Sequence, residues 1–253
     1  MISAVVIAKN EEARIGACIE ALVKVTDDVI LLDSGSSDKT ANIAASKGAI
    51  VKHIKWRGYG PTKNLGVEYA KYDWILSIDA DEVLSDELIE EIKTLGLNPK
   101  HIYAINILTN YCGKWIYHSG WYPSYKKRLY HSNFVEWDQR EVHENLTWED
   151  NDVVVKNLNN KLYHYSYPTA EVHFEKADQY AKLGAEHLIK SGKNVPVVKR
   201  MFGPMYRFFR MYILKLGILD GSAGFLLAYR EAGMVRKRYK YYKMMKYEKR
   251  IKN

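Results

Sequence analysis

Three carboxylates follow a run of apolar residues in the stretch W-I-L-S-I-D-A-D-E at positions 74–82. Asp79, Asp81 and Glu82 share four positions at the end of a predicted buried strand. Like charges at this spacing repel one another, and removing them from water costs further free energy. One explanation is a solvated loop that caps a helix. The other is a site for a divalent cation such as Mg²⁺ or Mn²⁺, which prefers oxygen ligands.

Two further polar clusters follow predicted strands nearer the N-terminus. They are A-K-N-E-E at 8–12 and D-S-G-S-S-D at 33–38. Asn10 and Asp38 are ordinary helix caps and Gly35 is an ordinary turn residue, so neither cluster is informative alone. Parallel sheets bind ligands beyond the carboxyl ends of their strands, however. Three such clusters at successive strand ends therefore favour a ligand site.

Strand and helix signals alternate through the first hundred residues. Apolar runs at 3–8, 29–32, 49–54 and 73–78 predict strands, and helices are expected after Asn10, after 36–38, over 62–71 and from Ser85. Continuous apolar strands separated by helices are typical of an α/β fold with a parallel sheet covered on both faces. The usual glycine-rich dinucleotide and P-loop motifs are absent from the sequence, so those sites are not supported.

The character of the sequence changes after about residue 98. Strands are predicted at 102–108, 125–130 and 153–163, and helices at 174–190, at 197–216 and from about 224 to the basic end. The helix at 197–216 is amphipathic, because apolar and basic residues recur on opposite faces. The apolar face holds Met201, Met205, Phe208, Phe209, Tyr212, Ile213 and Leu216, and the basic face Arg200, Arg207, Arg210 and Lys215.

The formal net charge is +8, and the excess lies near the C-terminus. Positions 230–253 hold ten Lys and Arg but two acids. A basic segment indicates an anionic partner, either membrane phosphates or nucleic acid, unless it is only a solvated helix end. No nucleic-acid module accompanies it, which favours the membrane. No run is long and apolar enough to span a bilayer, because the best stretch, 212–229, contains Lys215 and Asp220.

Two cysteines, Cys18 and Cys112, have neither metal-site nor Cys-x-x-Cys spacing, which indicates reduced thiols in a cytosolic protein.

The N-terminal clusters resemble motifs of the family 2 glycosyltransferases, which have the GT-A fold. The matching stretches are V-V-I-A-K-N-E-E, V-I-L-L-D-S-G-S-S-D-K-T and W-I-L-S-I-D-A-D-E. Further stretches are similar to a bacterial branch that includes lipopolysaccharide core β-1,4-glucosyltransferases: G-Y-G-P-T-K-N at 58–64, G-W-Y-P at 120–123, R-L-Y at 128–130, V-H-E at 142–144 and L-D-G-S-A-G at 219–224. The resemblance implies a GT-A catalytic domain at 1–168, with a nucleotide-binding half (1–98) and an acceptor half (99–168), followed by a helical extension at 169–253.

The resemblance also implies roles for individual residues. Asp33 would accept a hydrogen bond from uracil, Lys63 would approach the diphosphate, and Asp81 would bind Mn²⁺ or Mg²⁺. Asp79 would face the ribose and the sugar, and it is the second candidate ligand of the metal. His143 is a further candidate ligand of the metal or of a phosphate. The remaining residues expected to contact the nucleotide-sugar are Ala8, Asn10, Glu12, Ser34, Gly35 and Ala80.

An inverting transfer needs a general base that takes the proton of the acceptor hydroxyl. The candidates lie in E-W-D-Q-R-E-V-H-E at 136–144: Glu144 first, then Glu141 and Asp138. Without the resemblance, each would be interpreted as a surface residue.

The predicted function is therefore an inverting, metal-dependent transfer of a hexose, with glucose the first choice, from a UDP-sugar to a bacterial surface glycan precursor. The expected partners are the UDP-sugar, a glycan or glycolipid acceptor, and the inner face of the cytoplasmic membrane, contacted peripherally through the basic helices; nucleic acid is not expected. A homodimer through these helices stays open. A peptide or protein acceptor, and a non-catalytic sugar-nucleotide-binding module, are the alternatives.

Overall fold

A computed structural model describes residues 1–139, 144–192 and 194–252, with Lys176 and residues 249–252 described by backbone alone. The chain forms two compact units. The sheet unit comprises residues 1–107 and 124–164, and the helical unit comprises residues 108–123 and 165–253. This division differs from the expected one, because residues 108–123 group with the helices rather than with the sheet.

The sheet unit is built on four parallel strands in the order β3-β2-β1-β4. They are β1 (Ile2–Ala8), β2 (Val29–Asp33), β3 (Ile50–His53) and β4 (Trp74–Asp79). Beyond β4 the sheet continues as β8 (Tyr125–His131), β6 (His101–Tyr111), β11 (Val154–Tyr167) and β5 (Glu82–Leu84), with antiparallel pairing of β8 to β4 and to β6 and of β5 to β11. The predicted α/β class is confirmed, and the second half of the sheet adds antiparallel pairing to it.

Helices and short strands complete the sheet unit. They are α1 (Ile15–Leu22), α2 (Thr40–Ser46), α3 (Tyr59–Glu68), α4 (Asp86–Thr94), β9 (Glu136–Trp137) and β10 (Leu146–Thr147). α3 begins three residues before the expected start at Thr62. Pro61 falls in its first turn, where the missing N–H costs no helical hydrogen bond. Ser85, where this helix was expected to begin, is the N-cap of α4, since its hydroxyl accepts from the N–H of Leu88 at 3.1 Å.

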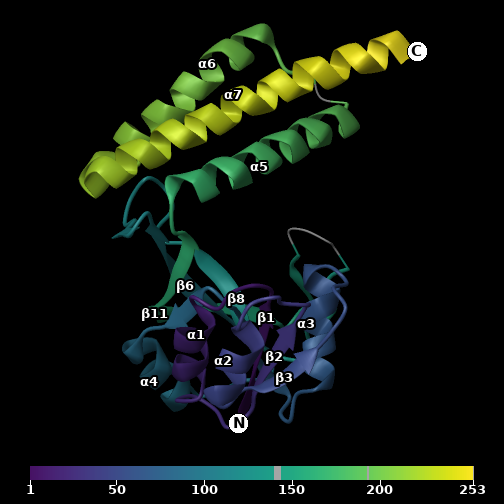
Figure 1. Ribbon diagram of the computed structural model, residues 1–253, viewed down its shortest axis with the longest axis vertical. Helices are drawn as coiled ribbons and strands as arrows, with labels where there is room; N and C mark the ends of the chain where they lie inside the picture. Colours follow the sequence, from purple (N-terminus) through teal and green to yellow (C-terminus); the bar gives the residue numbers. More distant parts are fainter. Residues whose placement is uncertain (140–143, 193, 253) are drawn as a thin grey trace. The chain divides into compact units, whose positions relative to one another are not determined.

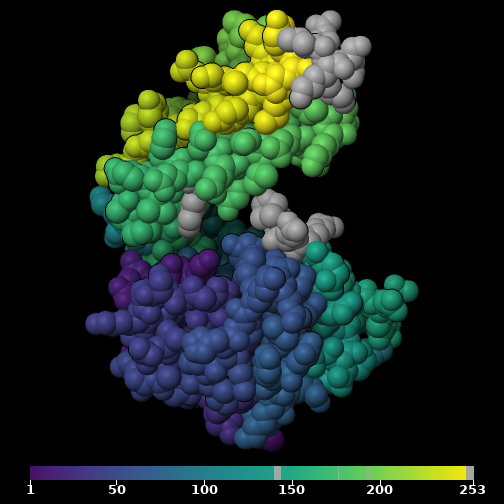
Figure 2. Space-filling view, turned by 45° about the vertical axis from the view of Figure 1, so that its right-hand side comes forward, coloured from purple at the N-terminus to yellow at the C-terminus, as the bar shows by residue number. Residues whose placement is uncertain are grey.

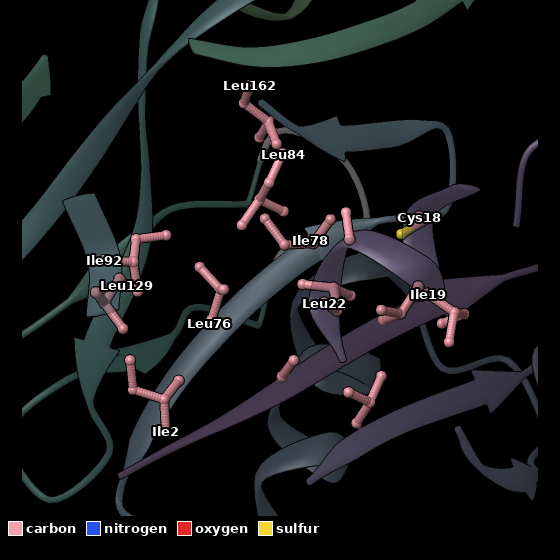
Figure 3. Close-up of a cluster of buried hydrophobic side chains, with 14 of the residues drawn as sticks. Ile2, Cys18, Ile19, Leu22, Leu76, Ile78, Leu84, Ile92, Leu129 and Leu162 are labelled. Carbon is pink, nitrogen blue, oxygen red and sulfur yellow. The ribbon is translucent and has the colours of Figure 1, made fainter. Parts of the chain in front are cut away.

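Both faces of β1, β2 and β4 are buried, whereas the edge strand β3 is exposed or half-buried along its length. One face places Ile2, Leu76 and Ile78 against Ile19 and Leu22 of α1, as the close-up in Figure 3 shows. The opposite face collects a second apolar cluster that includes Val5, Ile7, Ile30, Leu32 and Ile75. This double burial explains why these strands are continuous apolar runs rather than alternating ones.

The helical unit contains β7 (Lys114–Trp115), α5 (Ala170–Lys190), α6 (Val197–Phe209), the π-helical turn η1 (Arg210–Leu214), the 3₁₀ turn η2 (Gly217–Asp220) and α7 (Gly221–Lys252). In Figure 1, α7 lies between α5 and α6. The chain bends sharply between η1 and α7. A Cβ at Gly224 would lie 1.9 Å from the carbonyl oxygen of Gly217, so only glycine allows this approach.

Asp220 explains why residues 108–123 belong to the helical unit. Its carboxylate accepts hydrogen bonds from the backbone N–H groups of Tyr117 and His118, each at 3.0 Å. Tyr111 and Ile116 are buried with Met211 and Leu227 in the apolar core of this unit. The L-D-G-S-A-G motif therefore holds the 108–123 segment to the start of α7.

No single helix in the described part of the chain has both the length and the apolar composition of a membrane span. One sharply bent pair of helical segments, 197–214 with 217–248, has the length and the apolar composition of a span when the two are taken together.

Candidate active site

The carboxyl ends of β1, β2 and β4 meet at one edge of the sheet. Ala8 is the register partner of Asp33, and Ile7 is the register partner of Asp79. The first and second polar clusters of the sequence are thus joined to the third by the parallel register itself. This edge is where parallel sheets bind ligands.

Asp33 ends β2 with its carboxylate almost fully buried. It accepts from the N–H of Ser36 at 3.2 Å and from the Ser36 hydroxyl, and its other oxygen lies 3.0 Å from Nδ1 of His53. Gly35 has φ of 87°, which lets the chain turn back immediately after the strand. The carboxylate is therefore fixed in orientation at the end of the strand.

Asn10 and Glu12 connect the first two clusters. The side-chain oxygen of Asn10 accepts from the N–H of Ser37 at 2.8 Å, and a carboxylate oxygen of Glu12 accepts from the N–H of Lys39 at 3.1 Å. Asn10 has φ of 57° and precedes α1 by several residues, so it is not a helix cap. Ser34 of the second cluster also contacts the first cluster, because its N–H and its hydroxyl both donate to the carbonyl oxygen of Ala8, each at 3.0 Å.

Five charged side chains, two of them from the third cluster, form a continuous network of ion pairs. Lys63 of α3 lies 2.8 Å from Glu144 and 3.2 Å from Asp79. Arg128 of β8 lies 2.7 Å from Asp79 and also pairs with Glu82. Lys63 and Glu82 are almost fully buried, so these pairings offset the cost of removing their charges from water.

The network sets the pKa values of its members in opposite directions. Burial disfavours ionisation of Asp79, but the charges of Arg128 and Lys63 outweigh it and hold the pKa of Asp79 well below its usual range. Burial raises the pKa of Glu82, and the charge of Asp79 adds to that rise. Burial alone would lower the pKa of Arg128, yet both carboxylates raise it, so this guanidinium stays charged.

Asp81 and His164 form the pair that could hold a divalent cation. Nε2 of His164, on β11, lies 3.3 Å from a carboxylate oxygen of Asp81. Burial lowers the pKa of His164, but its contact with Asp81 and the charges of Asp81, Glu82 and Asp79 raise it by more. No group of three or more such ligands occurs among the residues with described side chains. Two protein ligands are sufficient for Mg²⁺ or Mn²⁺ where substrate phosphates complete the shell.

Two of the predicted base candidates are described: Asp138 follows β9, which packs on α3, and Glu144 precedes β10. Asn64 of α3 exchanges two hydrogen bonds with the backbone of Trp137, at 2.8 and 2.9 Å, and Figure 2 shows this teal segment beside the blue one. A Cβ at Gly60 would lie 2.0 Å from the carbonyl oxygen of Asp138, so this packing needs glycine. Glu144 joins the network, Asp138 lies nearby on the same segment, and Glu141 and His143 fall outside the described residues.

Sequence reasoning missed Arg128, His53 and His164. Arg128 stands in the R-L-Y motif without an assigned role, and His164 lies one residue beyond the strand predicted at 153–163, where a single histidine carries little signal. His53 is the last residue of β3, and its position at a strand end is the signal that could have identified it. Ala80, predicted near the sugar, is buried in the apolar core between Asp79 and Asp81.

Comparisons with known proteins show what this chain is similar to. The family model "Glycosyl transferase family 2" matches residues 3–145. An "Uncharacterized glycosyltransferase" of Rickettsia bellii is 34% identical, over 89% of this chain and 80% of the relative. The "Lipopolysaccharide core biosynthesis glycosyltransferase LpsC" of Rhizobium meliloti is 29% identical, over 90% of this chain and 86% of the relative. A solved structure of S. aureus TarS in complex with UDP-GlcNAc superposes with a TM-score of 0.47 at 13% identity, covering 94% of this chain and 91% of that one.

The family match covers more than half of the chain and includes every strand end that carries the polar clusters. The sheet, with its parallel half and added antiparallel strands, is a GT-A type fold. This chain belongs to glycosyl transferase family 2, and it is a transferase of the GT-A fold.

Proposed function

We propose that this protein transfers a hexose, with glucose the first choice, from a UDP-sugar to a lipid-linked bacterial glycan, with inversion at the anomeric carbon. The observation that carries the proposal is the meeting of Asp33, Asp79 and Asp81 at one sheet edge, where β1, β2 and β4 end. In this proposal Asp33 would accept a hydrogen bond from the uracil base. Asp79 and Asp81 lie two residues apart, on the side where the diphosphate and the sugar would follow.

The metal requirement rests on Asp81 and His164. Their donor atoms approach within 3.3 Å, and a hard carboxylate oxygen suits Mn²⁺ or Mg²⁺. A cation bound there would neutralise the charge that develops on the departing nucleoside diphosphate. Asp79 has a different role in this proposal, because Lys63 and Arg128 already pair with both of its oxygens. It would orient the sugar and hold Lys63 near the diphosphate.

Glu144 is the proposed general base. In the transfer, an acceptor oxygen forms a bond to the anomeric carbon while the bond from that carbon to the diphosphate breaks, and the hydroxyl proton passes to the carboxylate. The side chain of Glu144 is 16% exposed, so an acceptor can reach it. Lys63 would orient it through their 2.8 Å contact.

The acceptor class is inferred from two features. The relative LpsC is named for lipopolysaccharide core biosynthesis, and it resembles nearly the whole chain. The C-terminal helices carry ten Lys and Arg between residues 230 and 253, which suits peripheral contact with an anionic membrane. A glycan attached to a lipid at the membrane satisfies both.

The test is release of UDP from a panel of UDP- and GDP-sugars, with and without Mn²⁺, by the wild type, Asp81→Ala, His164→Gln and Asp86→Asn. One UDP-sugar should be hydrolysed slowly when Mn²⁺ is present, and EDTA should abolish the reaction. Asp81→Ala should lose activity by about 10²- to 10³-fold, by analogy with the loss of one transition-state contact. Asp86→Asn is the matched control, because Asp86 is an exposed acid at the start of α4.

His164→Gln should retain activity but need a higher Mn²⁺ concentration for half-maximal rate. If no sugar nucleotide is hydrolysed and calorimetry detects no UDP binding with Mn²⁺, the proposal is wrong. If hydrolysis needs no metal and Asp81→Ala leaves its rate unchanged, the proposed metal site is wrong, but the proposed transferase activity still stands.

A further inference from the structure

A groove within the helical unit has an apolar lining. It lies between α5, α6 and α7 and has a volume of about 580 Å³, within the range of about 300–1,000 Å³ typical of small-molecule sites. Phe174, Met205, Phe208, Phe209 and Met234 line it. These side chains provide little hydrogen bonding, which a sugar or a nucleotide would need. The lining favours an apolar chain.

Three basic residues of α7 line the same groove. Lys237 is already paired, because its Nζ lies 2.6 Å from Asp178 and 3.6 Å from the ring centroid of Phe174. Nε of Arg230 is buried and has no hydrogen-bond partner in the described part of the chain. Arg236 is exposed, and none of the described acids forms an ion pair with it. The guanidinium of Arg230 also stands over the ring of Phe174, with its Cζ 5.6 Å from the ring centroid, but this contact uses the face of the group and not its N–H donors. Together with Arg236 it provides guanidinium donors that are well suited to phosphate.

The surface next to the groove is apolar and exposed. No residue of α6 is buried, and Val198, Met201 and Met205 are 66%, 63% and 67% exposed. Exposed apolar residues continue at Leu214 and Leu219, beyond the bend. Positions 197–253 carry fifteen Lys and Arg against three acids. An apolar helix face with basic flanks is typical of helices that lie in a bilayer interface.

We infer that the groove binds one acyl chain of an anionic phospholipid, with the lipid phosphate at Arg230 and Arg236, while α6 lies on the membrane surface. The apolar lining accounts for the chain, the two available guanidinium groups for the phosphate, and the exposed face of α6 for the source of the lipid. The inference goes beyond the proposed sugar transfer and does not depend on the donor or the metal.

Gly233 makes the groove testable. It lies in the lining, and a Cβ built on it meets no atom within 4 Å, so the space in front of it is open. Gly233→Trp should fill the groove without a clash at the backbone. Gly233→Ala makes the same backbone change with almost no added volume and serves as the matched control. Since glycine is a poor helix former, both variants should fold at least as stably as the wild type.

The probe is a single-chain lysophosphatidylglycerol below its micelle concentration, measured with the full chain by native mass spectrometry and calorimetry. The wild type should bind one molecule. Gly233→Trp should weaken binding at least tenfold, Gly233→Ala less than twofold, and the double variant Arg230→Gln/Arg236→Gln at least fivefold. Lysophosphatidylcholine with the same chain, and glycerol phosphate without one, should each bind at least tenfold more weakly.

Each contrary result overturns the inference in its own way. Unchanged binding by Gly233→Trp places the lipid elsewhere, and tight binding of glycerol phosphate leaves only a phosphate site. A wild-type dimer that Gly233→Trp converts to a monomer, without lipid binding, assigns the groove to a second copy of the chain. Circular dichroism checks the fold, and hydrolysis of the UDP-sugar by Gly233→Trp keeps this test separate from the sugar-transfer proposal.

Discussion

The sheet unit and the helical unit differ in how far their charged and apolar side chains are buried and paired. At the sheet edge, Lys63, Arg128 and Glu82 are buried and paired, and the apolar residues are enclosed between strands and helices. In the helical unit, α6 exposes its apolar face, while α7 carries arginines without acid partners among the described residues. Paired burial fixes geometry, which catalysis needs. Exposed apolar and basic groups are instead accessible to a partner, as the inferred lipid binding requires.

The largest effect should come from the proposed base. Glu144→Gln keeps the size of the side chain but removes its ability to take a proton, so transfer should fall by about 10²- to 10⁴-fold. Binding of UDP with Mn²⁺, measured by calorimetry, should stay within about threefold of the wild type. Glu149→Gln, on the exposed loop of the same segment, is the control. Equal losses in transfer and in UDP binding would assign Glu144 to donor binding.

The buried network should be costly to break. Arg128→Met leaves Asp79 and Glu82 buried without their shared cation, so the free energy of unfolding should fall by about 3–5 kcal/mol. Urea denaturation followed by circular dichroism measures it. Adding Glu82→Gln to Arg128→Met should recover part of the loss, because one buried charge is removed. No recovery would mean that Arg128 contributes through packing.

Two glycines should distinguish the tightly packed unit from the open groove. A Cβ at Gly66 of α3 would lie 2.3 Å from a methyl group of Val5, so Gly66→Ala should destabilise the protein by about 1–3 kcal/mol. Gly233→Ala of α7 meets open space and improves helix propensity, so it should stabilise by up to about 1 kcal/mol. Thermal unfolding measures both. A similar loss for Gly233→Ala would show that the groove is closed in solution.

The smallest effects should come from single basic residues of α7. Lys240→Gln and Lys243→Gln should each weaken binding to vesicles containing phosphatidylglycerol by about 1 kcal/mol, or roughly fivefold, at low salt. Flotation with the vesicles measures this. Lys126→Gln and Lys156→Gln, exposed in the sheet unit, change the net charge equally and should have little effect. Equal effects from all four would indicate attraction by net charge rather than by α7.

The strands and the polar clusters that follow them could be predicted from the sequence because both depend on local patterns. Apolar runs marked β1, β2 and β4, and the polar residues after them had to share an edge once the strands were parallel. The partners of those residues could not be predicted. Arg128 comes from an antiparallel strand and His164 from β11, and no local pattern relates either of them to Asp79 or Asp81.

The sequence by itself determined the α/β class, the three strand-end clusters and the amphipathic character of the helix at 197–216. These depend on which residues neighbour one another along the chain, and hydrophobic period and turn residues record that directly. The tertiary structure alone decided that Lys63 bridges Glu144 and Asp79, that His164 approaches Asp81, and that α5, α6 and α7 enclose a groove. Those outcomes depend on contacts between residues far apart in the chain. Such contacts form only when the elements pack together, and no local sequence pattern records them.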